Sequence, residues 1–174
     1  MNVSLDGFVA PPSGDHDWVF RSFNDELEKY TADQFWQVGV HIMGSVTYHE
    51  MAAHWPSSTA KLAPPMNEIP KIIFSKTLKK TEWNNSQVVN GDIEEEIYRL
   101  KQQPGKDILA HGGMRFAQSL SRLGLIDEYR LIVNPIAFGR GVPLFKDLSA
   151  PLSLKLLSTK VFKKGAVLHT YQPV

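Results

Sequence analysis

Residues 107–116 restrict the possible folds of this chain more than any other segment. A short and mostly apolar stretch, Asp107-Ile-Leu-Ala, is followed by a histidine, the glycine pair Gly112-Gly113 and a segment with helical character. A strand that passes directly into a helix is the basic unit of a parallel sheet covered by helices. Glycines let a backbone approach a ligand closely, and the free amides of a helix N-terminus attract phosphate. An ordinary strand-to-helix turn is the alternative interpretation of the same residues.

A second strand, expected at residues 38–43, ends in a similar way. Gly44 leads from it into a helix, and either Ser45 or Thr47 could cap the first turn. The amides of that turn could also face a phosphate, although capping alone explains these residue types equally well. Two such junctions in one sheet favour a ligand crevice at the carboxyl ends of the strands.

A third strand, expected at residues 71–74, is followed by a hydroxyl group and a base. Ser75 and Lys76 at the end of a strand could hold a monophosphate, such as the 2′-phosphate of NADPH. The alternative is a solvated turn, because Lys79 and Lys80 show that bases are common in this stretch.

Hydrophobic runs, caps and turn residues predict alternating strands and helices along the whole chain. Asn24 and Asp92 are the expected N-caps of two helices, and Lys163-Lys164-Gly165 has the turn chemistry of a final hairpin. The expected strands are residues 1–5, 38–43, 71–74, 87–89, 107–110, 128–133, 154–161 and 166–171, and the expected helices are residues 24–37, 47–54, 92–103 and 113–124.

These elements predict one α/β domain over residues 1–174, with a mixed sheet that is mainly parallel and has an antiparallel edge. Residues 6–17 are expected to form a loop, since they are rich in glycine, proline and aspartate. A polar loop is also expected around Pro64, Pro65 and Pro70.

The composition excludes several classes of function. The chain has no cysteine, which excludes disulfide frameworks, thiolate zinc sites and cysteine nucleophiles. Its formal charge is +1 with acids and bases interspersed, so we expect no binding to nucleic acid or to an anionic membrane. The chain has no apolar run near the roughly 20 residues that span a bilayer. Its N-terminal segment lacks the regions of a secretory signal, and we therefore expect a cytoplasmic protein.

Histidines and serines offer no strong catalytic pattern. His49-Glu50 and His54 resemble the zinc motif His-Glu-x-x-His with one residue too many, which places the two rings about 140° apart around a helix. We therefore expect no metal, and we expect the remaining histidines to be surface or core residues. The Gly-x-Ser-x-Gly elbow of serine hydrolases does not occur in the sequence.

Two carboxylates are candidates for a catalytic group. Asp6 precedes Gly7 where the first strand opens into the long loop, and Asp33 lies near Phe35 and Trp36 on the first helix. A carboxyl group flanked by aromatic rings can retain a proton and donate it to a reduced substrate. We prefer Asp6 as a contact on the substrate side and give Asp33 second place as a proton donor. The alternatives are that Asp6 shapes the turn and that Asp33 faces water.

Together these segments resemble the dihydrofolate-reductase-like superfamily. The closest resemblance is to the family named after the reductase domain at the C-terminus of the bifunctional riboflavin-biosynthesis deaminase-reductase. The segments that carry it occur in the order of the family and extend over essentially the whole chain: residues 4–10, 43–48, 74–77, 110–114 and 127–145. The resemblance implies a single domain with a three-layer dihydrofolate-reductase-like α/β fold, a mostly parallel mixed central sheet and an antiparallel C-terminal hairpin.

The resemblance also implies a bound NADPH. The glycine pair would hold the pyrophosphate, with the turn after Gly44 on its other side. Ser75 and Lys76 would meet the 2′-phosphate of the adenosine, and the loop backbone would lie beside the nicotinamide. The cofactor-binding residues implied in this way are Val9, Ala10, Gly44, Ser45, Thr47, Ser75, Lys76, Gly112, Gly113 and Met114. Members of the family are commonly homodimers, so we expect a homodimer here.

The function implied is hydride transfer from NADPH to a small conjugated or carbonyl-like heterocycle. In the riboflavin pathway, the substrate would be a 5-amino-6-(5-phosphoribosylamino)uracil-type compound, which is reduced at its ribose carbon. The cofactor supplies the hydride, so the protein has to orient and desolvate the reactants rather than provide a strong acid–base group. Two alternatives remain: a dihydrofolate or pterin reductase that uses Asp33, and a nucleotide-binding protein of the same fold without turnover.

Overall fold

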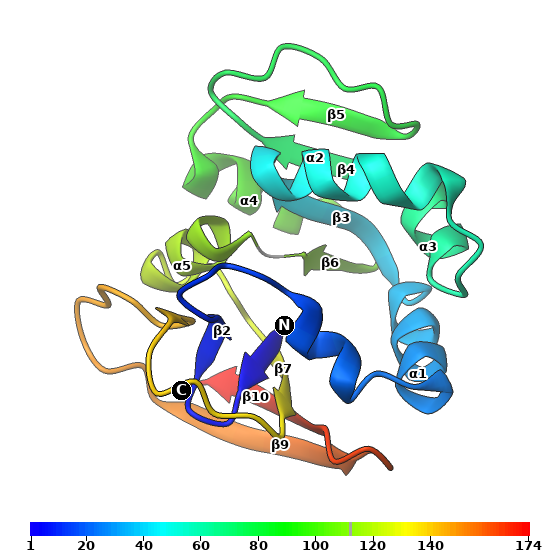
Figure 1. Ribbon diagram of the computed structural model, residues 1–174. Coiled ribbons are helices and arrows are strands. Elements are labelled where there is room, and N and C mark those ends of the chain that lie inside the picture. Colours follow the sequence, from blue (N-terminus) through cyan, green and yellow to red (C-terminus); the bar gives the residue numbers. More distant parts are fainter. Residues whose placement is uncertain (112) are drawn as a thin grey trace. The chain divides into compact units, whose positions relative to one another are not determined.

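Short strands alternate with helices over most of the chain (Figure 1). The computed structural model describes residues 1–111 and 113–174. These residues pack into two compact units. The first, here called the terminal unit, consists of Met1–Leu27 and Ala117–Val174, and the second, the middle unit, is Glu28–Phe116.

The middle unit contains a four-stranded sheet in which every strand pair is parallel. The strand order is β5-β4-β3-β6. The bounds of these strands are β3 Val38–Gly44, β4 Lys71–Phe74, β5 Ser86–Val89 and β6 Asp107–Ala110. Since the strands run in one direction, their carboxyl ends all lie at the same edge of the sheet.

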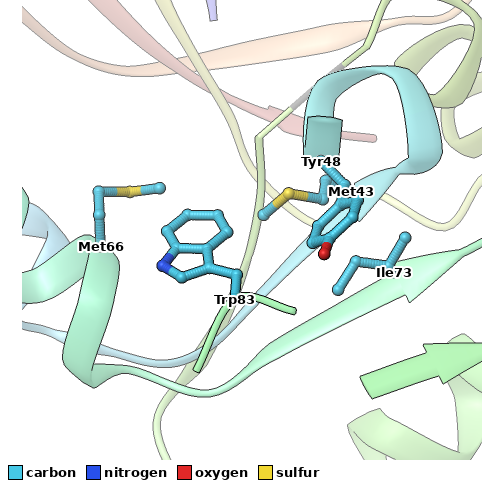
Figure 2. Close-up of a cluster of buried hydrophobic side chains, with 5 residues drawn as sticks. All are labelled: Met43, Tyr48, Met66, Ile73 and Trp83. Atoms are coloured by element: carbon cyan, nitrogen blue, oxygen red, sulfur yellow. The ribbon is translucent and has the colours of Figure 1, made fainter. Parts of the chain in front are cut away.

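Helices cover both faces of this sheet. On one face, α2 (Ser45–His54) and α3 (Ala63–Glu68) contribute to a buried cluster. Figure 2 shows its members, which are Met43, Tyr48, Met66, Ile73 and Trp83. On the other face, Phe116 of α5 (Met114–Arg122) packs on Phe74 with 5.1 Å between ring centroids. Neighbouring residues of a strand point to opposite faces, which explains why Ile73 and Phe74 meet different helices.

Two helices begin at the residues that the sequence predicts as caps. Asn24 precedes α1 (Asp25–Phe35), and its side-chain oxygen accepts a hydrogen bond from the Leu27 amide at 3.0 Å. Asp92 precedes α4 (Ile93–Lys101) and accepts from the amides of the second and third helical residues at 2.9 and 3.2 Å. Both caps are confirmed.

The predicted polar loop before β4 contains a helix. After the short 3-10 helix η2 (Trp55–Ser57), the chain forms α3 at Ala63–Glu68. The loop prediction is wrong for these residues because Pro64 and Pro65 fall in the first turn of α3. Amides in a first turn have no acceptor within the helix, so proline costs little there.

The terminal unit contains a mixed four-stranded sheet with the order β1-β7-β10-β9. Its strands are β1 Asn2–Ser4, β7 Tyr129–Asn134, β9 Leu154–Val161 and β10 Val167–Pro173. β1 runs parallel to β7, whereas β10 is antiparallel to β7 and β9. Gly165 lies in the turn between β9 and β10 with a φ of +85°, so the predicted antiparallel C-terminal hairpin is confirmed.

A small two-stranded sheet completes the terminal unit. β2 (Phe8–Ala10) pairs antiparallel with β8 (Val142–Pro143), and the short 3-10 helix η1 (Asp17–Arg21) follows β2. The sequence predicts a loop at Phe8–Ala10, and this is wrong. The partner strand has two residues and lies far along the chain, so no local pattern indicates the pairing.

The α/β class with mostly parallel strand pairing is confirmed, and hydrogen bonds group the strands into sheets of four, two and four. Of the helices in the described residues, none has the length and the apolar character that crossing a membrane requires.

Candidate functional site

The carboxyl ends of three neighbouring strands of the middle unit meet at one edge of its sheet. β6, β3 and β4 are adjacent, with Ile42 opposite Ala110 and Gly44 opposite Phe74. β3 leads directly into α2, and α5 begins at Met114 shortly after β6. The crevice outside the carboxyl ends of strands is where open α/β sheets bind ligands. The three junctions predicted from the sequence therefore share one edge, which we call the junction edge.

Gly113 lies against Thr47 at the junction edge. Gly113 has a φ of +79°, in the left-handed region that favours glycine, and a Cβ at this position would lie 2.7 Å from Thr47 Oγ1. The hydroxyl of Thr47 thus fills the space that a side chain would need. The other member of the predicted pair, Gly112, lies outside the described residues.

A second contact joins the same two junctions. A Cβ on Gly44 would lie 3.5 Å from the Cβ of Phe116, which is ordinary van der Waals contact. Gly44 is also the N-cap of α2, and as a glycine it has no side chain that could accept a hydrogen bond from the first turn. The prediction that Ser45 or Thr47 caps this helix is therefore wrong: the helix begins directly after the strand, and Thr47 is already inside its first turn.

The first turn of α2 therefore presents backbone amides without a side-chain cap. The start of α5 lies beside it through the contact of Gly113 with Thr47. Amides of this kind, together with the helix dipole, attract anions. The close contact of Gly113 with Thr47 brings two helix N-termini together, an arrangement that suits the pyrophosphate of a dinucleotide.

Ser75 and Lys76 follow β4 at the same edge. The oxygen of Ser75 accepts from the amides of Thr77 and Leu78 at 3.3 and 3.0 Å, which orders the turn. Lys76 Nζ donates to two backbone carbonyls after β5, those of Asn90 and Gly91, at 2.8 and 3.0 Å. The side chain is exposed, so these carbonyls hold a positive charge at the surface beyond the ends of β4 and β5.

Asp6 lies in the terminal unit, where it connects two loops. Its carboxylate accepts from Ser4 Oγ at 2.6 Å and from the amides of Phe138 and Gly139 at 3.0 and 2.7 Å. The hydrogen bond from Ser4, with those from the two amides, holds the pKa of Asp6 below its usual value. The carboxylate is therefore ionised at neutral pH and is oriented by the backbone around Phe138.

Val9 and Ala10 form the end of β2 in the terminal unit and are both buried. A Cβ on Gly141 would collide with the Ala10 carbonyl oxygen. The side chains of Val9 and Ala10 are buried, so a ligand could meet only those backbone groups of β2 that do not pack on Gly141 or pair with β8.

Asp33 lies on α1 and is paired within its own helix. Lys29 Nζ donates to its carboxylate at 2.7 Å, and the Asp33 side chain is 58% exposed. Such exposed pairs four residues apart are typical of a solvated helix face. Asp33 belongs to the middle unit and Asp6 to the terminal unit.

Two histidines of the middle unit form a pair that the sequence analysis missed. His41 is fully buried in β3, and its Nδ1 lies 2.7 Å from Nε2 of His111, which directly follows β6. The Nε2 atom of His41 lies 3.2 Å from the carbonyl oxygen of Pro65. Burial lowers the pKa of His41 to about 4, and burial together with His41 lowers that of His111 well below its usual value. The only sequence signal is that both histidines lie on predicted neighbouring strands or directly after them.

A buried lysine stabilises the opposite end of the same sheet. Lys71 begins β4 and is 1% exposed. Its Nζ donates to the carbonyls of Met66, Asn67 and Ile69 at 2.9 to 3.0 Å and lies 4.6 Å from the centroid of the Trp83 ring. Burial lowers the pKa of Lys71 to about 8. These carbonyls end α3 and carry its negative partial charge, so the ammonium group attaches α3 to the sheet.

Comparison with known proteins gives consistent matches over the whole chain. The sequence pattern of the RibD C-terminal domain matches residues 1–168. The uncharacterized protein YyaP of Bacillus subtilis (strain 168) is 31% identical in an alignment of 175 positions, which covers 98% of this chain and 91% of YyaP. The uncharacterized protein YwjB of the same strain is 28% identical over 167 residues, which cover 96% of this chain and 92% of YwjB.

Solved structures share the fold. A Shewanella sp. PV-4 protein that is provisionally assigned to riboflavin biosynthesis superposes with a TM-score of 0.82 at 24% identity, over 100% of this chain and 96% of its own. A TM-score of 0.68 at 16% identity, over 99% of this chain, is found for a Thermotoga maritima protein. That protein is a diaminohydroxyphosphoribosylaminopyrimidine deaminase/5-amino-6-(5-phosphoribosylamino)uracil reductase, of which the match covers 55%.

Enterococcus faecalis dihydrofolate reductase gives a TM-score of 0.61 at 13% identity, over 99% of this chain and 92% of its own. At these identities, the structural comparisons establish a dihydrofolate-reductase-like fold. The family match extends over nearly the full length of the chain. The chain therefore belongs to the RibD C-terminal domain family.

Proposed function

We propose that this protein is a reductase that binds NADPH and uses it to reduce a small heterocyclic substrate. The observation that carries the proposal is the contact between Gly113 and Thr47, which brings two strand-to-helix junctions together at one edge of a parallel sheet. Membership of the RibD C-terminal domain family and the dihydrofolate-reductase-like fold support an oxidoreductase.

The middle unit would bind the phosphates of the cofactor. The amides at Ser45–Thr47 and at Gly113–Met114 would hold the pyrophosphate, since the N-cap of α2 is a glycine without a capping side chain. Ser75 and Lys76 would meet the 2′-phosphate, with the Lys76 ammonium held by two carbonyls. The resemblance to the family implies that the backbone of Val9 and Ala10 would lie beside the nicotinamide. Bound NADPH supplies the hydride, and these residues bind, orient and exclude water.

The substrate class that we propose is a ribosylamino-pyrimidine phosphate, such as a 5-amino-6-(5-phosphoribosylamino)uracil-type compound. The Thermotoga maritima protein, whose fold this chain shares, is a reductase of that compound. A dihydrofolate or pterin reductase would need a carboxylate directed at the substrate. Asp33 is 58% exposed and paired with Lys29, an arrangement expected of a solvated helix face, so we give this candidate second place.

The direct test is NADPH oxidation by the purified protein with 5-amino-6-(5-phosphoribosylamino)uracil and with dihydrofolate as separate substrates. We expect turnover with the pyrimidine and little with dihydrofolate. Tight NADPH binding without oxidation by either compound would contradict the reductase assignment and favour a nucleotide-binding protein. Faster turnover of dihydrofolate would show that the substrate is a dihydrofolate or pterin and not a ribosylamino-pyrimidine phosphate.

We also propose that a second copy of the chain is its partner. β9 is the last strand of its sheet, and Leu156, Leu157 and Val161 on it are 50%, 45% and 69% exposed. Exposed apolar side chains on an edge strand favour pairing with another chain. Light scattering should give a dimer for the parent and a monomer for Leu156→Lys/Leu157→Lys. Tyr98→Lys, at an exposed residue of α4, is the control. A monomeric parent would contradict the proposal.

A further inference from the structure

The hydrogen bonds of His41 determine which of its ring nitrogens carries the proton. Its Nε2 lies 3.2 Å from the Pro65 carbonyl oxygen, and a carbonyl can only accept. Nε2 therefore carries the proton. The ring is fully buried and neutral, so its Nδ1 holds a lone pair.

The same reasoning extends to His111. Its Nε2 lies 2.7 Å from Nδ1 of His41, and since that atom has only a lone pair to offer, Nε2 of His111 must donate. His111 is neutral as well, which leaves its Nδ1 without a proton. The two hydrogen bonds run from His111 through His41 to the Pro65 carbonyl, which cannot release a proton. The pair therefore fixes a tautomer and does not conduct protons.

Packing holds both rings in this arrangement. The ring centroids of the two histidines are 4.6 Å apart, and Phe35 contacts both rings edge-on at 5.7 and 5.1 Å. The amide of His111 also donates to the Ile42 carbonyl at 2.9 Å, which continues the pairing of β6 with β3. Ring rotation of His111 would break these contacts, so its orientation is fixed.

Nδ1 of His111 is the one polar ring atom of the pair without a hydrogen-bond partner in the described part of the chain. The ring is only partly buried. It directly follows β6 at the junction edge, two residues before Gly113. A fixed acceptor therefore lies beside the place where we propose that the cofactor binds.

We propose that His111 is a ligand-binding residue whose Nδ1 accepts a hydrogen bond from an N–H or O–H group of the bound ligand, and that His41 is a positioning residue that keeps this nitrogen unprotonated. This inference rests on the proposed function. Groups of this chemistry occur both on the cofactor, as a carboxamide or ribose hydroxyl, and on an aminopyrimidine. A ligand that offers only a carbonyl at this position would place the lone pairs of its oxygen against the lone pair of Nδ1. It would therefore bind less well.

Nitrogen-15 NMR of the full chain labelled at histidine tests the tautomer in the free protein. We expect His111 to show a protonated Nε2 and an unprotonated Nδ1. His41→Leu removes the acceptor for Nε2 and should give a tautomer mixture. His41→Asn places an amide oxygen where Nδ1 of His41 lies and should restore the parent spectrum. A protonated Nδ1 in the free parent would overturn the positioning role.

The same spectra recorded with ligand test the acceptor role. NADPH is added alone in one arm and with 5,6-diaminouracil in the other. We expect the Nδ1 resonance of His111 to shift as for an accepted hydrogen bond, while Nε2 stays protonated. A shift with NADPH alone assigns the donor to the cofactor, and a shift only in the second arm assigns it to the pyrimidine. An unmoved resonance in both arms at saturation would overturn the proposal.

A matched pair of variants gives a second readout. His111→Asn keeps an acceptor near the position of Nδ1, whereas His111→Gln keeps only the group that reaches His41. Affinity for the ligand that shifts Nδ1 should fall about tenfold in His111→Gln and stay within about threefold in His111→Asn. Equal losses in both variants would contradict the acceptor role. If tryptophan fluorescence shows no NADPH binding to the parent, the proposed function is wrong. The tautomer of His111 is still tested separately by the spectra of the free protein.

Discussion

The hydroxyl of Thr47 occupies the space that a side chain at Gly113 would need, since a Cβ there would lie 2.7 Å from Oγ1. Gly113 also has a φ of +79°. In Gly113→Ala, Thr47 or the start of α5 has to move, which displaces the amides proposed to hold the pyrophosphate. We expect NADPH affinity to fall at least about tenfold in a fluorescence titration.

Gly124→Ala provides the matched control. Gly124 has a φ of +64° and open space where a Cβ would project, and it follows the last residue of α5 by two positions. Backbone strain alone costs about 1–2 kcal/mol at such a position. Both variants should therefore lose stability, but only Gly113→Ala should lose NADPH affinity. Equal NADPH affinities in the two variants would show that Gly113 is not part of the cofactor site.

Lys76 should determine the preference for NADPH over NADH. Its ammonium is held by the carbonyls of Asn90 and Gly91 at 2.8 and 3.0 Å, and a charge-assisted contact to a 2′-phosphate is worth about 1.5–3 kcal/mol. Lys76→Ala should weaken NADPH roughly ten- to a hundredfold and leave NADH unchanged. Lys79→Ala, at an exposed lysine of the same stretch, should change neither. Equal weakening of both cofactors would exclude a contact with the 2′-phosphate.

Asp6 and Asp33 should differ in their effects on stability. Asp6 accepts from Ser4 and from two backbone amides, so Asp6→Asn should lower the Tm clearly. Its folded-state pKa is lowered, so this contribution is present above the unfolded pKa of about 3.8 and is lost as the pH falls below it. Asp33→Asn removes one exposed pair with Lys29 and should leave the Tm nearly unchanged.

The same two variants test the choice of substrate-side carboxylate. If Asp6 contacts the substrate, Asp6→Asn lowers kcat/KM while the Kd for NADPH stays the same. We expect this result for Asp6→Asn and parent-like kinetics for Asp33→Asn. The reverse pattern would favour an arrangement like that of folate reductases, and parent-like turnover in both variants would make both acids structural.

Buried His41 should make the protein sensitive to mild acid. Its folded-state pKa of about 4 lies below the unfolded value of 6.5, so the unfolded state binds the proton first. Stability is therefore complete above pH 6.5 and falls toward pH 4, by roughly 3 kcal/mol from this group. Chemical denaturation across this range should show a flatter profile for His41→Asn. His16→Asn, at an exposed histidine, should follow the parent. A parent-like profile for His41→Asn would contradict the account.

Local patterns predicted the elements whose causes are local. The sequence predicts these elements correctly because each depends on a few neighbouring residues. They are the apolar run of β3, the caps Asn24 and Asp92 and the turn around Gly165. The junction edge followed from the same patterns, since parallel strands bring their carboxyl ends together.

Features that depend on pairing between distant residues could not be predicted in this way. β2 needs a two-residue partner strand far along the chain. The bond between His41 and His111 depends on the register of β3 and β6, which places residues 70 positions apart within 2.7 Å. The burial of Lys71 depends on three carbonyls at the end of α3, and the prolines of that helix predict a loop instead.

A crystal structure of the protein grown with saturating NADPH tests the central claim most directly. The account predicts the pyrophosphate at the N-termini of α2 and α5, beside Thr47 and Gly113, with the 2′-phosphate within hydrogen-bonding distance of Lys76 Nζ. Cofactor bound elsewhere, or an empty junction edge in crystals grown at saturating NADPH, would contradict it.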